Sequence, residues 1–564
     1  MDFVLPLHSH LPYVLNHGRW PHGSDWLCEA TLDTYLPLIE ALRALEGDRI
    51  QAPVTLGITP VLANQLASPV FVAELEAFVA QRLAACDEAR ATLATTGEAH
   101  LLPLVDYWRW RLIRLRDLFR SLDGDLIGAV RRLESDGRLE TMGGAATHGF
   151  LPLFARDESI RLQLAVGRTE HRRLFGRLPD GIWLPECAYR PRGPWRPSRT
   201  APRAGVRRGI EEHLTDAGFR YFFVDSHLAS AGRPLGIYGD PAGPAIVRRH
   251  RLTPQGESTA HRSPYLAYRV AHSRSAAGIA AMVRDPRSSL QVWSRYQGYP
   301  GDPAYLEFHK MRWPGGMKLW RVTGTDVDLG DKAPYDPATA RSRAREHAGH
   351  FAGLLGEIAD REGQPRDGVI VAPFDTELFG HWWFEGPDWL GDVYRRLAAD
   401  GAVRVVTAGE HLAAHPARTP VRLTSGSWGA NGDFSMWLND ATRWTWERLW
   451  SLEDLFWDAA PGALGRPAAA PVLAQAAREL LLAQASDWQF IISTGAAADY
   501  AELRFRRHCD DAESLLAALR SDGESSFPRA QGLAEELARR DHIFPDITPA
   551  IAAALGGSRS LAVG

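Results

Sequence analysis

Two acidic residues follow apolar runs in this 564-residue chain. Glu186 ends the run 181–185, and Asp375 ends the run 368–374. A carboxylate among buried apolar residues carries a large desolvation cost unless it is paired or used in a reaction. Taken alone, Glu186 is explained equally well as a helix cap or an ion-pair partner. Because Asp375 stands in the same kind of setting, a catalytic role for the two carboxylates is favoured over a structural one.

The position of the two carboxylates, each at the end of a predicted strand, suits cleavage of a glycosidic bond. In a parallel α/β barrel the carboxyl ends of the strands converge on one face, so Glu186 and Asp375 could lie side by side there. In a retaining glycosidase one carboxylate attacks the anomeric carbon and the other protonates the leaving oxygen.

Three histidines, His8, His10 and His148, also stand near the ends of predicted strands. There they could hydrogen-bond sugar hydroxyls around the carboxylates. The His-x-His spacing has a rival use, because it places both rings on one side of a strand, as in metal-dependent hydrolases and deacetylases. The residues alone leave both uses open.

The composition narrows the possible partners. Lys and Arg (64) nearly balance Asp and Glu (68), and the one Arg- and Pro-rich segment is 190–209, so we expect no nucleic acid partner. Tryptophan (19) outnumbers tyrosine (14), and flat aromatic faces suit sugars. Core packing remains the better explanation for any single tryptophan.

The cysteines and the apolar runs indicate the compartment. The four cysteines are far apart and form no CxxC pair, which is typical of a reducing compartment. Cys187, next to Glu186, is better explained as a buried filler than as a nucleophile. The first residues lack a signal-peptide pattern, and no apolar run is long enough to span a membrane, so we expect a cytoplasmic protein with no membrane partner.

Strand and helix patterns alternate over residues 1–415 and then give way to helices. This order predicts a barrel-like domain at 1–415 and a helical domain at 416–564 that contributes to the substrate groove. We expect a helical insertion at about 70–135 and irregular loops at about 190–209 and 229–264. The strands are expected at 2–7, 54–60, 139–149, 181–186, 221–225, from 290 onward, at 368–375 and at 403–406. The tail after about 545 is expected to fray.

Seven motifs in chain order resemble the conserved regions of glycoside hydrolase family 57, in particular those of its 1,4-α-glucan branching enzymes. The motifs are His8-Ser9-His10-Leu11-Pro12-Tyr13; Thr147-His148-Gly149-Phe150; Trp183-Leu184-Pro185-Glu186-Cys187-Ala188-Tyr189; Gln291-Val292-Trp293-Ser294 with Gly298-Tyr299-Pro300-Gly301-Asp302; Ala372-Pro373-Phe374-Asp375-Thr376-Glu377-Leu378-Phe379-Gly380-His381-Trp382-Trp383; Ser427-Trp428-Gly429 with Trp437; and Ser486-Asp487-Trp488. Single motifs of this kind are weak, but seven in order cover nearly the whole chain.

The resemblance implies an α/β fold, namely an incomplete (β/α)7 barrel with an inserted helical region and an all-helical C-terminal domain. It implies no metal and no organic cofactor. It assigns the nucleophile to Glu186 and the general acid/base to Asp375. The implied reaction is a retaining transglycosylation, in which an α-1,4 link is cleaved and the chain is transferred to a 6-hydroxyl to form an α-1,6 branch.

The expected substrate is an α-1,4-glucan polymer such as glycogen or amylose, bound by a monomer or a small homo-oligomer. Besides the three histidines, the expected substrate-binding residues are Trp26, Trp293, Trp428 and Trp437 in an acceptor groove, Tyr238 on a covering loop, and Asp487 and Trp488 from the helical domain. Trp183 and Tyr189 are expected to keep water away from Glu186.

Three alternatives remain. The first is a 4-α-glucanotransferase or α-amylase of the same family. The second is a metal-dependent polysaccharide deacetylase with His8 and His10 as ligands. The third is a glucan-binding protein without catalytic activity.

Overall fold

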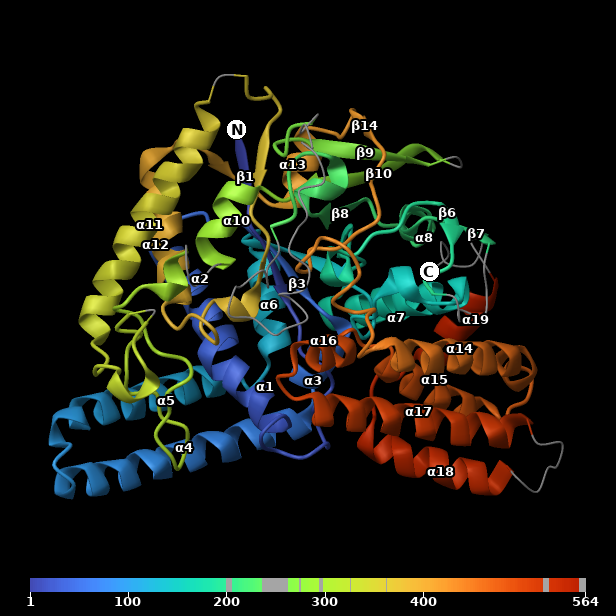
Figure 1. The fold of residues 1–564 in the computed structure, drawn as a ribbon, viewed down its shortest axis with the longest axis horizontal. Helices are drawn as coiled ribbons and strands as arrows, with labels where there is room; N and C mark the ends of the chain where they lie inside the picture. Colours follow the sequence, from blue (N-terminus) through green and yellow to red (C-terminus); the bar gives the residue numbers. More distant parts are fainter. Residues whose placement is uncertain are drawn as a thin grey trace.

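The computed structural model describes residues 1–198, 205–235, 262–272, 275–293, 298–324, 326–361, 363–520 and 527–556. A curled sheet lies at the centre of these residues, and helices pack around it and beside it (Figure 1). The arrangement confirms the predicted fold class, an incomplete (β/α)7 barrel with an inserted helical region and a helical C-terminal domain.

Parallel strands at seven positions form the barrel wall in the described residues. Their bounds are β1 (Asp2–Val4) continued by β2 (Pro6–Ser9), β3 (Val54–Ile58), β4 (Leu139–Gly144), β5 (Gly181–Trp183), β8 (Tyr221–Val224), β10 (Ser275–Val283), and β11 (Val369–Val371) continued by β12 (Phe374–Asp375). They pair in the order β12-β2-β3-β4-β5-β8-β10. The amide of Asp285, just after β10, donates to the carbonyl of Val371 at 2.8 Å and brings the two ends of the wall together.

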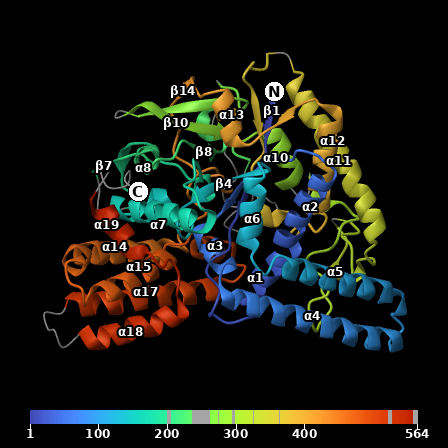
Figure 2. The same cartoon turned by 180° about the vertical axis from the view of Figure 1, so that it is seen from behind.

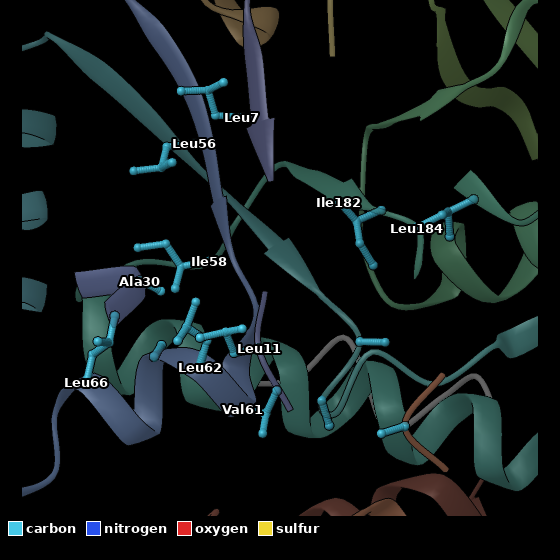
Figure 3. Packing of buried hydrophobic residues seen from close by; sticks show 14 of the residues in the cluster. Leu7, Leu11, Ala30, Leu56, Ile58, Val61, Leu62, Leu66, Ile182 and Leu184 are labelled. Atoms are coloured by element: carbon cyan, nitrogen blue, oxygen red, sulfur yellow. The ribbon is translucent and has the colours of Figure 1, made fainter. Parts of the chain in front are cut away.

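Alternation along the strands separates an outer core from an inner one. Leu56 and Ile58 of β3 point outward, and Ile58 lies near Leu62 of the covering helix α3 (Pro60–Leu66) (Figure 3). Met142 and Trp183 belong to a second cluster inside the barrel. Because successive side chains on a strand point to opposite faces, the same alternation directs polar residues at the strand ends into the barrel mouth.

Shorter strands extend the sheet beyond the barrel wall. They are β9 (Ala267–His272), antiparallel to β10, β13 (Arg404–Val405) on β1, and β14 (Pro420–Val421) on β9. A separate two-stranded sheet is formed by the hairpin of β6 (Gly193–Trp195) and β7 (Gly205–Arg207). Since β14 still belongs to the sheet, the domain boundary at residue 415 stays a prediction.

The prediction of a strand from Leu290 onward is wrong. These residues lie in helix α10 (Pro286–Trp293), and the barrel strand precedes it at β10. The carboxylate of Asp285 accepts hydrogen bonds from the amides of Arg287 (3.2 Å) and Ser288 (2.8 Å), and Pro286 stands where the missing amide hydrogen does no harm. These start signals outweigh the short apolar run at 290–293.

Helices cover the outside of the barrel on both sides of the view in Figures 1 and 2. They are α1 (Ser24–Ala30), the π-helical turn η1 (Thr31–Tyr35), α2 (Leu36–Gly47), α3, α7 (Asp157–Phe175), α8 (Ile210–Asp216), α11 (Pro337–Ala359), α12 (Gly386–Asp400) and α13 (Ala408–Ala414). The predicted helical insertion corresponds to α4 (Pro69–Thr95), α5 (Leu102–Ser121) and α6 (Leu126–Ser135). The helices α4 and α5 lie side by side and extend away from the barrel. No described helix is long and apolar enough to cross a membrane.

The Arg- and Pro-rich segment 190–209 was expected to be an irregular, solvated loop. Its described part instead contains the β6–β7 hairpin, which is held against the barrel. The indole nitrogen of Trp195 donates to the carbonyl of Pro152 at 3.0 Å, and Arg207 lies over the Trp195 ring and pairs with Asp157 of α7. Arg207 therefore has its partners on the protein itself.

The C-terminal helices form a layer beside the barrel. Their bounds are α14 (Arg443–Leu464), α15 (Ala470–Ala483), α16 (Asp487–Thr494), α17 (Ala498–Arg520), α18 (Phe527–Arg540) and α19 (Ile547–Gly556). The prediction that the tail after about 545 frays is wrong for α19, because this helix packs against α7. Ile551 and Ala554 are fully buried there, and Arg161 of α7 donates to the Ala554 carbonyl at 2.6 Å.

Glu453 joins α14 to the loop that precedes α7. One carboxylate oxygen accepts the amides of Ala155 (2.6 Å) and Arg156 (3.3 Å), and the other accepts the side-chain amide of Gln484 (2.8 Å). Glu453 is fully buried, so these bonds replace all contact with water.

We expect Glu453→Ala to lower the free energy of unfolding by about 3 kcal/mol, because it leaves three buried donors without an acceptor. Glu453→Gln keeps one oxygen for the loop amides and should lose less. Denaturant unfolding of both variants measures the effect, and a loss below about 1 kcal/mol for the alanine variant would contradict the role given to Glu453.

Candidate active site

Glu186 lies at the carboxyl end of β5, on the short 3₁₀ turn η4 (Pro185–Cys187). Its Oε2 accepts the indole N–H of Trp428 at 2.9 Å, and its Oε1 accepts the hydroxyl of Ser486 at 3.2 Å. Only 17% of its side chain is exposed. Two donors from segments more than 240 residues away therefore fix this carboxylate in one orientation.

The backbone at Glu186 is strained. Its φ of 60° and the 48° of Cys187 lie in the left-handed region, which costs a residue with a side chain about 1–2 kcal/mol. The amide of Trp428 donates to the Glu186 carbonyl at 3.0 Å, and Tyr189 exchanges two backbone hydrogen bonds with Gly426. These contacts hold the turn and aim the carboxylate inward.

Asp375 ends β12, where it pairs in register with His8 of β2. Burial raises the pKa of Asp375 well above its usual range, and the negative charges of Glu377 and Glu186 raise it further. Burial also raises the pKa of Glu186 to about 7, but there the hydrogen bond from Trp428 works in the opposite direction. The arrangement favours an ionised Glu186 next to a protonated Asp375.

The three histidines form one stacked group at the mouth of the barrel. Nε2 of His8 lies 2.9 Å from Nε2 of His148, and the rings of His10 and His148 stack with 4.1 Å between centroids. His10 bonds the carboxylate of Asp487 at 2.9 Å and the hydroxyl of Thr59 at 3.0 Å. Nδ1 of His148 bonds Ser486 at 2.9 Å, so Ser486 bridges this group to Glu186.

The group favours one positive charge, on His10. Burial lowers the pKa of His8 and of His148 well below the usual range. Burial acts in the same direction on His10, but the Asp487 carboxylate outweighs it and raises the pKa of His10. A neutral ring can donate from one nitrogen and accept at the other, as sugar hydroxyls require. His148 uses both nitrogens on His8 and Ser486, whereas Nδ1 of His8 has no hydrogen-bond partner among the described residues.

The histidine geometry argues for hydrogen bonding over metal ligation. Both ring nitrogens of His10 already have partners in Thr59 and Asp487. Among the described residues, groups whose ligand atoms converge are Asp2, His411 and His415 at the other end of β1, and His17, His508 and Asp541 near the helical layer. In each, the carboxylate is already paired with an arginine, Arg404 or Arg540. The absence of a metal from the mechanism stays a prediction.

The predicted aromatic residues fall into separate places. Trp428 contacts Glu186, and its ring meets that of Trp293 at 5.2 Å. Trp437 is 1% exposed and stacks on Phe150, and Trp488 is fully buried under Arg504, so neither offers a face to a sugar. The partly buried Trp26 lies on α1 beside His22. Tyr238 lies outside the described residues.

Trp183 and Tyr189 lie on different sides of the barrel wall. Trp183 is inside, stacked on His8 at 4.8 Å, where it can exclude water from Glu186. The Tyr189 hydroxyl donates to Glu211 of α8 at 2.7 Å, so this ring belongs to the outer core, and its predicted shielding of Glu186 is wrong. Cys187 is buried, and burial raises the pKa of its thiol far above the usual range, which suits a filler and not a nucleophile.

Two further polar residues belong to the site. Glu377 accepts the Tyr35 hydroxyl at 2.6 Å and the His10 amide at 3.2 Å, and burial raises its pKa to about 7. Ser486 contacts both Glu186 and His148. Both residues stand inside motifs quoted above, two residues after Asp375 and one before Asp487, and that adjacency was the available signal.

Family models match most of the chain. Residues 4–423 match the model of glycosyl hydrolase family 57, and residues 461–551 match the C-terminal model of 1,4-alpha-glucan branching enzymes. Both catalytic candidates fall in the first region, and the second covers most of the helical layer.

Similar proteins span nearly the same length. A 1,4-alpha-glucan branching enzyme of Thermococcus kodakarensis is 39% identical over 96% of this chain and 77% of its own. The crystal structure of a branching enzyme from Pyrococcus horikoshii superimposes with a TM-score of 0.86 at 38% identity, over 98% of this chain and 96% of that one. An alpha-amylase from Thermotoga maritima gives a TM-score of 0.77 at 28% identity, over 98% of this chain and 99% of that one. The chain therefore belongs to glycosyl hydrolase family 57.

Proposed function

We propose that the protein is a retaining 1,4-α-glucan branching enzyme with Glu186 as nucleophile and Asp375 as general acid/base. The observation that carries this proposal is the pair of largely buried carboxyl groups at the ends of β5 and β12, one hydrogen-bonded by Trp428 and Ser486 and the other facing negative charges. Such a pair can supply an anion and a proton at one bond.

The reaction runs in two displacements. Glu186 attacks the anomeric carbon of an α-1,4-linked glucose, and Asp375 gives its proton to the departing oxygen, which leaves on the reducing-end fragment. A 6-hydroxyl of a glucan then attacks the same carbon and loses its proton to Asp375 as the bond to Glu186 breaks. Nδ1 of His8, which has no partner among the described residues, would bind a sugar hydroxyl. Trp183 would exclude water, and the cationic His10 supports the ionised form of Glu186.

Transfer to a 6-hydroxyl is supported by the relatives whose names describe branching enzymes, at 38% and 39% identity. The match of the C-terminal helices to a branching-enzyme model points the same way, because these helices supply Ser486 and Asp487 to the site. Hydrolysis is the second candidate, since an alpha-amylase shares the fold over nearly the whole chain. The glycogen-like polymer, the cytoplasmic location and the oligomeric state stay predictions.

Branching has a direct test in the product. Amylose incubated with the protein should gain the proton NMR signal of α-1,6 anomeric protons, with few new reducing ends per bond cleaved. Shorter α-1,4 chains without that signal would favour a 4-α-glucanotransferase, and a matching rise in reducing ends would favour an amylase.

Glu186→Gln should reduce the rate of α-1,4 cleavage by at least about 10⁴-fold, because the amide cannot form the glycosyl ester. Asp375→Asn should reduce it by about 10²–10⁴-fold. Mass spectrometry after reaction with a fluorinated glucosyl fluoride should place the sugar on the peptide containing Glu186. Full activity of Glu186→Gln, or a label elsewhere, would remove the proposed mechanism.

The pH profile should report Glu186. Since burial raises its pKa to about 7, kcat/KM should fall as the pH drops below about 7 and the nucleophile is protonated. The Trp428 N–H stabilises the charged form, so Trp428→Phe should raise this pKa and move the acid limb up by about one unit. Trp437→Phe, a buried indole stacked on Phe150, is the matched control and should leave the limb in place. An unmoved limb in Trp428→Phe would contradict the assignment.

A further inference from the structure

Arg284 is a buried cation inside the barrel that the reaction above does not use. It follows β10 directly, and its amide donates to the carbonyl of Val224 at 3.0 Å. Its side chain is 1% exposed, and none of its three guanidinium nitrogens has a hydrogen-bond partner among the described residues. A buried cation with unmet donors carries a large desolvation cost, so its presence needs a reason.

One carboxylate anchors Arg284 from behind. Oδ2 of Asp225, at the end of the neighbouring strand β8, lies 3.7 Å from Nη1 of Arg284, and both side chains are 1% exposed. Oδ1 of Asp225 accepts the Ser226 amide at 2.6 Å, and His227 lies 3.7 Å from Oδ2. The pair is neutral overall, which makes its burial tolerable.

Two tryptophans cover the guanidinium, and each is bonded to a catalytic segment. The centre of the guanidinium lies 5.4 Å from the Trp293 ring and 5.6 Å from the Trp428 ring. Trp428 donates to the carboxylate of Glu186, and Trp293 donates to the carbonyl of Pro373 at 3.3 Å, two residues before Asp375. Arg284 therefore lies between the two indoles that hold the nucleophile and the acid/base strand.

Given the proposed function, we propose that Arg284 is a positioning residue for both catalytic carboxyl groups. Its guanidinium, anchored by Asp225, fixes Trp293 and Trp428, and its permanent charge opposes the negative groups around Asp375. That charge matters most in the second displacement, where Asp375 must be ionised to take the proton of the acceptor hydroxyl.

The charged groups around Asp375 and Arg284 determine how the charge of Arg284 changes the pKa of Asp375. The groups facing Asp375 are Glu377 on its own segment, Glu186 on η4, Cys187, the neutral His8 on β2, and Arg284. The groups facing Arg284 are Asp225, Cys187, Asp375 and Asp285. Among those that act on Asp375, Arg284 lowers its pKa, whereas burial, Glu377 and Glu186 raise it.

The test is the basic limb of the pH profile of kcat/KM for α-1,4 cleavage, which reports the loss of the proton from Asp375. Arg284→Met removes the charge, so the limb should move up by about one pH unit, and the glycosyl-enzyme on Glu186 should accumulate because the second displacement slows. Arg284→Lys keeps the charge and should leave the limb nearly in place, with a lower rate because an ammonium does not fill the space between two rings.

Asp225→Asn should shift the basic limb in the direction opposite to that of Arg284→Met. It leaves the charge of Arg284 unopposed, so the basic limb should move down. A merely structural role for the pair would not separate these directions. Asp225→Asn and Arg284→Lys also decide the matter if Arg284→Met fails to fold, as judged by circular dichroism. Arg478→Met, the same substitution at a buried arginine of α15 bonded to the Ile543 carbonyl, should leave the limb in place.

The inference would be overturned if the basic limb lay at the same pH in all folded variants. It would also be overturned if Arg284→Met and Asp225→Asn moved the limb in the same direction. The result is separate from the test of branching, because cleavage of α-1,4 bonds is measured whether the fragment goes to a sugar or to water. A wild-type protein that cleaves without making α-1,6 links would refute branching and leave the role of Arg284 open to the same measurement.

Discussion

Two acidic groups share the mouth of this barrel, and like charges in a largely buried site resist ionising together. Nearly everything around them serves to separate their protonation states. Trp428 and Ser486 donate to Glu186, whereas Asp375 faces Glu377 and Glu186. The two carboxyl groups therefore differ in their tendency to ionise because their neighbours differ.

The neighbours of Glu186 come from distant parts of the chain, and this ties catalysis to the packing of the helical layer. Ser486 and Asp487 stand at the start of α16, where they contact Glu186 and His10. Their position depends on buried contacts behind them, such as Glu453, which accepts from the loop before α7 and from Gln484. The helical layer therefore contributes side chains to the candidate active site as well as supporting the barrel.

The barrel interior also holds charge where a simple core would hold only apolar side chains. The pair of Asp225 and Arg284 lies beneath two indoles, and the strained turn at Glu186 is pinned by backbone bonds to the segment 426–428. Each feature costs stability locally and is retained where it fixes the orientation of a reacting group.

The sequence by itself determined the elements with strong local signals. Apolar runs ending in polar residues located most barrel strands, and the motifs around Glu186, Asp375 and the histidines selected the residues that the fold brings together. Local signals misled where two patterns competed. Residues from 290 onward form a helix because Asp285 and Pro286 start one, and α19 is ordered by its contacts with α7. Only the tertiary structure decided which tryptophans face the site, since Trp428 and Trp437 have similar local surroundings but one bonds Glu186 and the other packs on Phe150. It also supplied Arg284 and Ser486, because hydrogen bonds and charges between distant segments leave no periodic trace in the chain.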